Sequence, residues 1–549
     1  MNDYLKALLA NDLDLEKSQS SLLFSALLKP NAQTEFGLQH SFDQINSLDD
    51  YRRLVPLSDY EGFRAWVEKV ANGEQAILSQ ARTSSFFKTS GSLSKPKLIP
   101  VTADLMRQKV GVFAAYWESI YDAYPRIRDG KLVSNFSDAS EPEVLPSGLQ
   151  VFSESGFWAK RGRSLNSLER WPLPAEVRQV KDPVVRAYAS ARLLLQSELN
   201  CIMCLNPSTL LFFCRTMESY WSEIVDGLFT GGWGGEHNRT LSVLAADEHV
   251  SLSKHLQTRP EIALRLQGIN KDSGRFALKE LWPELDLVIC WHSQVVQPYF
   301  EQLSTYIRDI PTRDYITQSS ECMMAVPIGD FRSGGLLAHT AHFFEFIPES
   351  DVNNSVPTTR FAWQLEKGHR YELVVTTGGG LYRYRMGDCI QVNDFHGAVP
   401  VVEFLYRLGR TSSITGEKLT EFQVLRAAAF STESLRFSPD EFLCFPCGGH
   451  QPHYAVALEG SIKDITDEQL LDWVSSFDDQ LKKINSEYED KRNSGRLGEM
   501  SVFRSDVGRL RESRMLARAP GVSEEQVKSE VLSAKVDLHL HGLTIKQIR

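Results

Sequence analysis

The chain has 549 residues, of which 42% are apolar and 24% are charged, and its formal net charge is −10. This is an ordinary globular composition in a chain longer than one core usually fills, and the acidic balance argues against a nucleic-acid-binding protein, which would carry a basic face. No stretch of about 18 uncharged apolar residues occurs, so no membrane span is predicted and a cytoplasmic protein is expected. Eight cysteines are too sparse to form a disulfide framework, and oligomeric state cannot be read from the sequence.

The first half of the chain favours helices and then an α/β arrangement. Residues 47–73 combine capping residues with an apolar stripe that ends before Gly73. A short apolar strand, a loop of glycine and serine, and a long helix beginning near Thr102 follow. Between residues 180 and 310, helical segments alternate with apolar strands such as 285–291 (LDLVICW). This alternation predicts an α/β fold.

The second half is richer in strands. Short apolar runs with glycine turns between residues 320 and 410 predict a small sheet or barrel. Beyond residue 410, a turn leads into an amphipathic helix, two strands and a further helix with Thr466 as its N-cap. We therefore predict a large domain over residues 1–410 and a compact α+β domain over residues 411–549.

A polar loop at residues 88–97 (KTSGSLSKPK) follows the first predicted strand. Its backbone N–H groups, its hydroxyls and its lysines suit phosphate oxygens. The spacing is not that of a Walker A loop. A solvated turn with incidental lysines is the alternative. The residues predicted to bind phosphate here are Thr89, Ser90, Gly91, Ser92 and Lys97.

A glutamate follows two serines at Ser319, Ser320 and Glu321. A carboxylate beside hydroxyls at a strand end suits Mg²⁺, which takes one or two protein carboxylates together with substrate phosphates. A surface or N-capping glutamate is the alternative.

The stretch 376–388 (TTGGGLYRYRMGD) is the densest pattern in the chain. Three glycines allow unusual backbone angles or the close approach of a ligand. The tyrosines and arginines from Tyr382 to Arg385 are predicted to alternate along a strand. Asp388 would accept the hydroxyls of a ribose, as an acidic residue does in dinucleotide folds. A hairpin with an aspartate turn is the alternative.

In this order the motifs resemble the adenylate-forming superfamily, and more closely the Gretchen Hagen family of acyl acid–amido synthetases. The stretches 343–348 (FFEFIP), 371–377 (YELVVTT) and 380–388 carry the resemblance, and 416–421 (GEKLTE) looks like the motif of bacterial members. The family implies a large N-terminal adenylate-forming domain, built from α/β sheets with a small β-barrel, and a small mobile α+β C-terminal domain. It also implies ATP and Mg²⁺, a carboxylic acid and an amine as substrates, and AMP and pyrophosphate as products.

The resemblance assigns roles to matched positions. Ser319, Ser320 and Tyr382 join the phosphate loop among the nucleotide-binding residues, with Glu321 as the Mg²⁺ contact and Asp388 on the ribose. The arginine before the hinge is Arg407 or Arg410, and the lysines that the small domain brings to the phosphates are Lys418 and Lys528.

The chain departs from the family pattern at several positions. Thr317 stands where a tyrosine is expected, and no Pro-Arg follows Lys528. Two alternatives therefore stay open: an acyl-CoA or acyl-carrier ligase, and a nucleotide-binding protein that has lost catalysis. No general base is assigned, since His292, His339 and His342 fit packed positions better.

Overall fold

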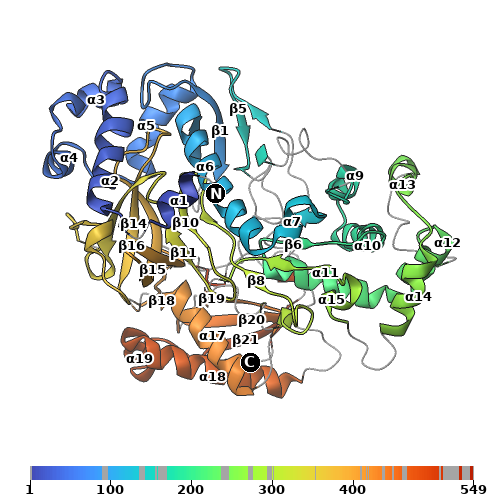
Figure 1. Ribbon diagram of the computed structural model, residues 1–549. Coiled ribbons are helices and arrows are strands. Elements are labelled where there is room, and N and C mark those ends of the chain that lie inside the picture. Colours follow the sequence, from blue (N-terminus) through green and yellow to red (C-terminus); the bar gives the residue numbers. More distant parts are fainter. Residues whose placement is uncertain are drawn as a thin grey trace. The chain divides into compact units, whose positions relative to one another are not determined.

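The computed structural model (Figure 1) describes most of the chain. The described residues are 3–10, 12–89, 97–134, 142–154, 157–158, 170–235, 246–269, 276–292, 300, 302–352, 354–408, 411–415, 417, 419–435, 439–447, 451–459, 466–505, 508–510, 531–533 and 545–547.

Helices are concentrated before residue 310 and after residue 420. The α-helices are α1 (Asp3–Leu8), α2 (Leu15–Ser21), α3 (Glu35–Gln39), α4 (Leu48–Leu54), α5 (Tyr60–Ala71), α6 (Ala103–Ala123), α7 (Pro125–Asp129), α9 (Ala175–Gln179), α10 (Pro183–Leu194), α11 (Pro207–Ser219), α12 (Trp221–Thr230), α13 (Ala246–Ser253), α14 (Pro260–Ile269), α15 (Leu278–Leu281), α17 (Glu421–Leu435), α18 (Asp467–Ile484) and α19 (Ser486–Asn493). Shorter or irregular turns of helix are η1 (Leu22–Leu28), η2 (Lys29–Asn31), η3 (Phe42–Gln44), η6 (Glu349–Asp351) and η7 (Ala362–Gln364).

Strands dominate the middle of the chain. They are β1 (Thr83–Thr89), β2 (Lys97–Thr102), β3 (Leu132–Ser134), β4 (Glu143–Val144), β5 (Gln150–Phe152), β6 (Cys201–Met203), β7 (Leu287–Ile289), β8 (Thr312–Arg313), β9 (Thr317–Gln318), β10 (Met323–Val326), β11 (Gly335–Leu337), β12 (Phe343–Pro348), β13 (Arg360–Phe361), β14 (Arg370–Thr376), β15 (Tyr384–His396), β16 (Val399–Arg407), β17 (Thr411–Ser412), β18 (Leu419–Thr420), β19 (Glu441–Cys447), β20 (His453–Glu459), β21 (Ser501–Ser505) and β22 (Ile545–Gln547).

The described residues divide into two compact units. The larger unit comprises those in 1–386 and 391–404, and the smaller comprises those in 387–390 and 405–549. The domain boundary near residue 410 stays a prediction. Among the described residues, no helix has both the length and the apolar composition needed to cross a bilayer.

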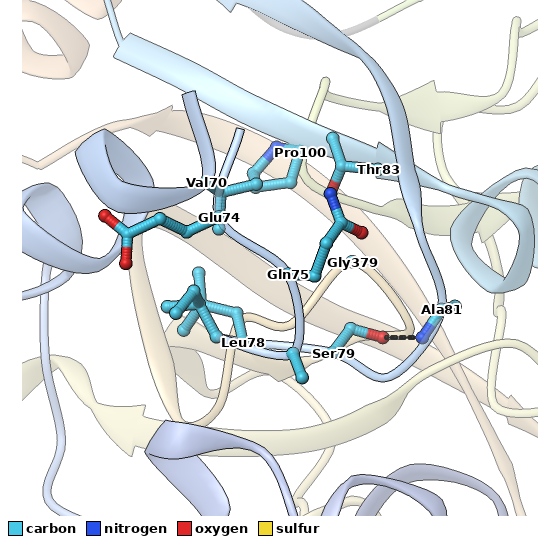
Figure 2. Close-up of a pocket in the computed structure, with 11 residues that line it drawn as sticks. Val70, Glu74, Gln75, Leu78, Ser79, Ala81, Thr83, Pro100 and Gly379 are labelled. Carbon is cyan, nitrogen blue, oxygen red and sulfur yellow. Dashed lines mark hydrogen bonds between the residues drawn. The ribbon is translucent and has the colours of Figure 1, made fainter. Parts of the chain in front are cut away.

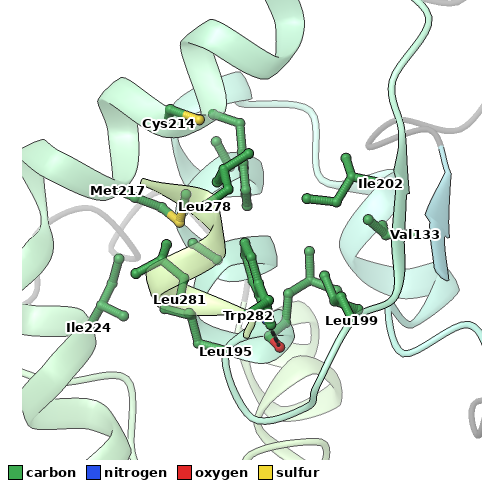
Figure 3. Packing of buried hydrophobic residues seen from close by; sticks show 14 of the residues in the cluster. Val133, Leu195, Leu199, Ile202, Cys214, Met217, Ile224, Leu278, Leu281 and Trp282 are labelled. Carbon is green, nitrogen blue, oxygen red and sulfur yellow. Dashed lines mark hydrogen bonds between the residues drawn. The ribbon is translucent and has the colours of Figure 1, made fainter. Parts of the chain in front are cut away.

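A parallel sheet with the strand order β3-β6-β7-β8 lies in the larger unit. Its strands are short and almost wholly buried, which is why they read as continuous apolar runs in the sequence. Helices α10, α11, α12 and α15 pack around it in one extensive apolar cluster (Figure 3). Trp282 lies in the middle of this cluster, and its indole N–H donates to the carbonyl of Ser197 at 3.0 Å.

The strand-rich region predicted as a small sheet or barrel forms an eight-stranded sheet, in the order β13-β12-β14-β15-β16-β11-β10-β9. It takes in the 320–337 segment as well as the later strands. A further sheet, β2-β1-β5-β4, contains the hairpin that bears the phosphate loop. The predicted α/β class is confirmed by this combination of helices and mixed sheets.

Two helix starts predicted from the sequence are confirmed. The hydroxyl of Thr102 accepts the N–H of Leu105 at 3.1 Å at the start of α6. Thr466 caps α18 by accepting the N–H of Gln469 at 3.2 Å, and the Gln469 side chain accepts the N–H of Thr466 in return. Both caps satisfy donors that the first turn of a helix leaves without a partner.

The smaller unit contains the sheet β19-β20-β21-β22 and helices α17, α18 and α19. Helices α17 and α18 pack side by side (Figure 1). Trp473 and Phe477 of α18 stack with ring centroids 5.2 Å apart, and Phe442 of β19 contacts both. Residues 405–549 thus supply a separate α+β core.

Candidate active site

The phosphate loop predicted from the sequence connects the two strands of a hairpin. β1 and β2 pair antiparallel, with Thr89 opposite Lys97 where the loop begins and ends. The predicted residues 90–92, and the side chain of Thr89, lie outside the described part of the structure. Lys97 is described, and its Nζ donates to the hydroxyl of Tyr384 at 3.4 Å.

The predicted serine–glutamate motif forms the turn between β9 and β10. The N–H of Ser319 donates to the carbonyl of Cys322 at 2.9 Å, and the N–H of Cys322 donates to the hydroxyl of Ser319 at 3.3 Å. Ser320 lies between them, and Glu321 is only 3% exposed. The hydroxyl of Tyr384 donates to Glu321 Oε1 at 3.5 Å. Glu321 is therefore a buried carboxylate in a closed turn, not a surface glutamate.

One tyrosine hydroxyl thus joins two of the predicted motifs. Tyr384 accepts a hydrogen bond from Lys97 and donates one to Glu321, both at long distances. A cation and a carboxylate separated by a phenol offer opposite charges to one ligand. Phosphate oxygens suit the ammonium group, and a hard divalent cation suits the carboxylate.

Tyr382 occupies a different environment from Tyr384. Its hydroxyl donates to the carbonyl of Leu78 at 2.8 Å, and its ring stacks on Phe36 with centroids 5.1 Å apart. The expected alternation from Tyr382 to Arg385 is wrong, because β15 begins only at Tyr384 and Arg383 has a φ of +47°. Arg383 precedes the strand with this left-handed backbone, and it is Tyr384, not Tyr382, that contacts Lys97 and Glu321. Nucleotide binding by Tyr382 stays a prediction that its packing does not favour.

The two arginines of this stretch pair with the glutamates of the other family motifs. Arg383 forms a two-pronged ion pair with Glu345 of FFEFIP, with N–O distances of 2.9 and 3.0 Å. Arg385 pairs with Glu372 of YELVVTT, at 2.5 Å for the shortest contact. Both glutamates are buried. The most recognisable motifs therefore include residues that hold one another in place.

The three glycines before this strand lie close to other segments of the larger unit. Gly378 donates its N–H to the side chain of Gln108 at 3.0 Å and accepts the hydroxyl of Thr102 at 2.7 Å. Gly380 has a φ of +89°, and a Cβ added there would come within 2.6 Å of the Leu78 Cβ. The close approach that the sequence suggested is made by the start of α6 and by the chain at Leu78.

Replacing Gly380 with alanine is expected to lower the melting temperature by several degrees. The left-handed backbone alone costs a non-glycine residue about 1–3 kcal/mol, and the contact with Leu78 adds to that cost. Gly368→Ala is the matched control, because Gly368 has a φ of +83° with no atom within 4 Å of an added Cβ. Thermal unfolding measures both variants. Equal losses would show that the Leu78 contact contributes nothing.

A small pocket in the larger unit borders the 376–388 stretch through Gly379 (Figure 2). It is lined by residues between Val70 and Thr83, with Pro100 and Gly379 completing the wall. Its polar groups include Glu74 and Ser79, and the hydroxyl of Ser79 accepts the N–H of Ala81 at 3.1 Å. None of its lining residues belongs to the predicted site. The chemistry of Lys97 and Glu321 is therefore a better guide to the active site than this hollow.

In the smaller unit the predicted ribose aspartate meets one of the two candidate arginines. Asp388 is buried, and its Oδ1 lies 3.7 Å from Nε of Arg407 on the neighbouring strand. The N–H of Leu408 donates to the carbonyl of Gly387 at 2.6 Å and fixes this corner. Arg410, the other candidate, lies outside the described residues.

Lys418 and Lys528 also lie outside the described residues, but their chain neighbours are well anchored. Glu417 accepts the N–H groups of Ile414 and Thr415 at 2.7 and 2.8 Å. It also accepts the hydroxyl of Tyr454. Burial opposes ionisation of Glu417, yet these hydrogen bonds hold its pKa below the usual range.

The chain just after Lys528 is tethered to β19. The N–H of Cys444 donates to the carbonyl of Val531 at 2.8 Å, and the N–H of Ser533 donates to the carbonyl of Cys444 at 2.9 Å. The N–H of Val531 also donates to Glu421 at 3.3 Å. Both predicted lysines are thus close in sequence to fixed points of the smaller unit.

Family models match most of the chain in three consecutive parts. The GH3 family N-terminal domain matches residues 5–312, the central domain matches 335–407 and the C-terminal domain matches 423–537. The chain belongs to the GH3 family. The resemblance predicted from the sequence is confirmed, while the bacterial subtype stays a prediction.

Relatives in the GH3 family are amide-forming ligases by name. The chain is 27% identical to the indole-3-acetic acid-amido synthetase GH3.15 of Arabidopsis thaliana, over 75% of this chain and 71% of that protein. It is 24% identical to the 4-substituted benzoates-glutamate ligase GH3.12 of the same plant, over 82% and 79%.

Solved structures support the same fold. The GH3.15 acyl acid amido synthetase matches with a TM-score of 0.80 at 22% identity, covering 97% of this chain and 93% of that one. A 2-hydroxyisobutyryl-CoA ligase matches with a TM-score of 0.50 at 11% identity, covering 96% and 89%. The predicted adenylate-forming fold is therefore confirmed.

Sequence reasoning missed a buried lysine near the GH3 serine–glutamate motif. Lys109 lies on α6, is completely buried, and forms an ion pair with Glu154 at 2.7 Å. Its Nζ also donates to the carbonyl of Ser319 at 2.6 Å. A pattern was present: Lys109 occupies the apolar stripe of α6, four residues after Leu105 and seven before Tyr116. A lysine there must have a buried partner.

The two histidines of the AHTAHFF segment are packed in the core, as the sequence predicted. His339 and His342 are buried, and Nε2 of His342 accepts the N–H of Met323 at 3.1 Å. Burial lowers the pKa of His339 to about 4 and, helped by the charge of Lys109, that of His342 to about 3. Both rings are neutral at pH 7.

These histidines predict a loss of stability on acidification. Below the ordinary histidine pKa of about 6.5, the unfolded chain binds protons that the folded chain does not, so stability falls as the pH drops from 6.5 towards 4. Each buried ring contributes a slope of up to about 1.4 kcal/mol per pH unit. His342→Gln should flatten the decline in melting temperature between pH 7 and pH 5. The exposed His369→Gln is the control, and equal slopes in both variants would contradict this account.

Proposed function

We propose that this GH3 protein is an ATP-dependent acyl acid–amido synthetase. It adenylates a carboxylic acid, releases pyrophosphate, and transfers the acyl group to an amine or amino acid with release of AMP. The observation that supports this proposal is that the Tyr384 hydroxyl hydrogen-bonds to both Lys97 and Glu321. These residues lie in a chain that three GH3 family models match in order. As a member of this family the chain is an amide-forming ligase.

The residues present fit Mg²⁺ and a triphosphate. Glu321 is a buried carboxylate, so an oxygen ligand is ready beside the cationic Lys97. A site of this kind, with one protein carboxylate and several phosphate oxygens, is what Mg²⁺ usually takes. We propose that Glu321, with Ser320 beside it, holds the metal ion. When bound, Mg²⁺ neutralises charge on the phosphate oxygens.

Two of the chain's own residues would then act in the first half-reaction. Lys97 pairs with a phosphate oxygen and offsets the negative charge that develops there. Tyr384 keeps the ammonium of Lys97 and the carboxylate of Glu321 apart at fixed positions. The acid carboxylate attacks the α-phosphorus, the bond to the leaving pyrophosphate breaks, and a mixed acyl–AMP anhydride forms.

Asp388 and Arg407 are proposed to hold the nucleoside. The Asp388 carboxylate accepts the ribose hydroxyls, and Arg407, whose Nε lies 3.7 Å from Oδ1, orients that carboxylate. The loop residues Thr89, Ser90, Gly91 and Ser92, together with Ser319, are proposed to complete the phosphate and nucleotide contacts. Arg410 remains the second candidate for the arginine of the hinge.

Lys418 and Lys528 are proposed as the catalytic lysines of the smaller unit. Their ammonium groups would stabilise charge on the phosphates during adenylation. In the second half-reaction the amine nitrogen attacks the acyl carbon, the bond from that carbon to the AMP oxygen breaks, and the nitrogen loses a proton. We further propose that residues 411–549 rotate about the 410–418 segment between the two steps.

The names of the relatives indicate the chemical classes of the acid and amine substrates that we propose. Relatives are named for indole-3-acetic acid and for 4-substituted benzoates with glutamate, and one structure of a relative is a complex with 2,4-DB. We therefore propose an aromatic or aryl-alkanoic acid and an amino acid.

All eight cysteines are free thiols, which supports the proposal of a reducing, cytoplasmic location.

ATP–pyrophosphate exchange across a panel of aromatic, aliphatic and hydroxy acids tests this function. Acid-dependent exchange is expected, and Lys528→Ala should abolish it. Product analysis with amino acids and with coenzyme A then separates amide from thioester formation. ATP binding without exchange for any acid would overturn the proposal in favour of a binding protein.

A further inference from the structure

The turn that carries Glu321 is held at both of its ends by buried side chains from elsewhere in the larger unit. The turn runs from Ser319 to Met323 and closes through two hydrogen bonds between Ser319 and Cys322. Those internal bonds shape the turn. They do not fix where it lies relative to β1, which leads into the phosphate loop.

Lys109 holds the first end of the turn. Its Nζ donates to the carbonyl of Ser319 at 2.6 Å and to Glu154 Oε1 at 2.7 Å. The same ammonium lies 5.7 Å from the ring centroid of Phe87 in β1. Lys109 therefore connects the strand of the phosphate loop with the turn of the metal-binding glutamate.

A buried ion pair is a costly means of adding stability. Apolar residues of the same volume often serve a core as well or better. Glu154 neutralises Lys109 and also accepts the indole N–H of Trp158 at 3.4 Å. The arrangement keeps one charged donor aimed at one backbone carbonyl, which is a positioning task.

His342 holds the other end. Its Nε2 accepts the N–H of Met323 at 3.1 Å, so the ring proton is on Nδ1. The backbone around this histidine is itself held by Gln19. Nε2 of Gln19 donates to the carbonyls of His339 and His342 at 2.6 and 2.8 Å, and its Oε1 accepts the N–H of Phe344 at 3.0 Å.

We infer that Lys109 and His342 are positioning residues that hold the Ser319–Met323 turn from its two ends and so set the place of the Glu321 carboxylate for MgATP. This inference rests on the proposed function. Each acts through a backbone group of the turn, Lys109 on a carbonyl and His342 on an N–H.

The test separates positioning from stability with a charge-matched pair of changes. Lys109→Met alone leaves Glu154 buried without its partner, so it is expected to unfold more easily. The double variant Lys109→Met/Glu154→Met removes both charges and should regain most of that stability, while the carbonyl of Ser319 still lacks its donor. Arg107→Met, on an exposed turn of the same helix, is the matched control.

Calorimetric titration of ATP into each protein at a series of Mg²⁺ concentrations is the readout. In the double variant, the Mg²⁺ concentration that gives half of the maximal ATP affinity is expected to rise about tenfold. Losses of this size are typical when a hydrogen bond that orients a metal-binding side chain is removed. His342→Leu, which removes the acceptor for Met323, should move it in the same direction. Arg107→Met should match the wild type.

The outcomes distinguish the inference from the proposed function. A double variant as stable as the wild type, with an unchanged Mg²⁺ requirement, would overturn the positioning role while leaving the ligase function intact. A wild-type protein that neither binds ATP nor exchanges pyrophosphate would overturn both. A raised Mg²⁺ requirement in a well-folded double variant supports the inference.

Discussion

Glu321→Gln is expected to lower acid-dependent ATP–pyrophosphate exchange by about 100-fold or more, the loss typical when one preorganised electrostatic contact to a transition state is removed. Glutamine keeps the size of glutamate and still offers an oxygen to the Tyr384 hydroxyl, which lies 3.5 Å away. It removes the negative charge that we propose to bind Mg²⁺. The defect should therefore be partly relieved by raising Mg²⁺, and rate measurements across a Mg²⁺ series check this.

The stability of this variant should move in the opposite direction from its activity. Glu321 is a buried carboxylate with a phenol and, through it, a lysine as its neighbours in the larger unit. Because burying that charge costs solvation, Glu321→Gln is expected to melt at the same temperature as the wild type or higher. Glu366→Gln, whose side chain is 73% exposed, is the control for both measurements. Loss of exchange together with loss of folding would show that Glu321 serves structure instead.

Helix starts and strands depend on interactions between residues close in the sequence, so local sequence patterns could predict them. The sequence predicted a helix start near Thr102 and a cap at Thr466, because the cap bonds reach only three residues along the chain. Apolar strands alternating with helical segments were predicted between residues 180 and 310, and the structure forms them as a buried parallel sheet. The serine–glutamate turn and the lysine after the phosphate loop were singled out by residue type, and the structure joins them through Tyr384.

The choice between two tyrosines could not be made from the sequence. An alternating pattern over 382–385 (YRYR) treats all four residues as strand, but Arg383 has a left-handed backbone held by contacts from distant segments. Its guanidinium donates to the carbonyls of Arg52 and Val55 at 3.0 and 2.8 Å, more than 300 residues earlier in the chain. A single non-glycine residue with positive φ leaves no mark in composition or periodicity.

The partners of the buried ion pairs also could not be predicted from the sequence. Lys109 and Glu154 are 45 residues apart, and Glu345 and Arg383 are 38 apart, so no helical or strand spacing connects them. The apolar stripe around Lys109 indicated that its ammonium group needed a partner, but not which one. Sequence therefore identified the chemistry of the site better than the scaffold that holds it.

Arg383→Met is expected to destabilise the larger unit by about 3–5 kcal/mol, the usual cost of breaking a buried ion pair by removing one partner. Its guanidinium makes two contacts with Glu345, at 2.9 and 3.0 Å, and Glu345 is 1% exposed. Methionine would leave that carboxylate with Arg52, 3.7 Å away, as its remaining basic neighbour among these contacts. Denaturation with urea, followed by tryptophan fluorescence, measures the loss.

A double-mutant cycle with Glu345→Gln separates the ion pair from the other bonds of Arg383. Removing both charges should recover part of the stability, because no carboxylate is then buried without its main partner. Recovery should be incomplete, since the carbonyls of Arg52 and Val55 still lose their donor. Arg385→Met is the matched comparison. The ion pair between Arg385 and Glu372 is shorter, but the arginine side chain is 27% exposed. Water can therefore solvate the site after the substitution, so the loss of stability should be smaller. If Arg383→Met costs no more than Arg385→Met, burial of the Glu345 pair is not what holds these motifs together.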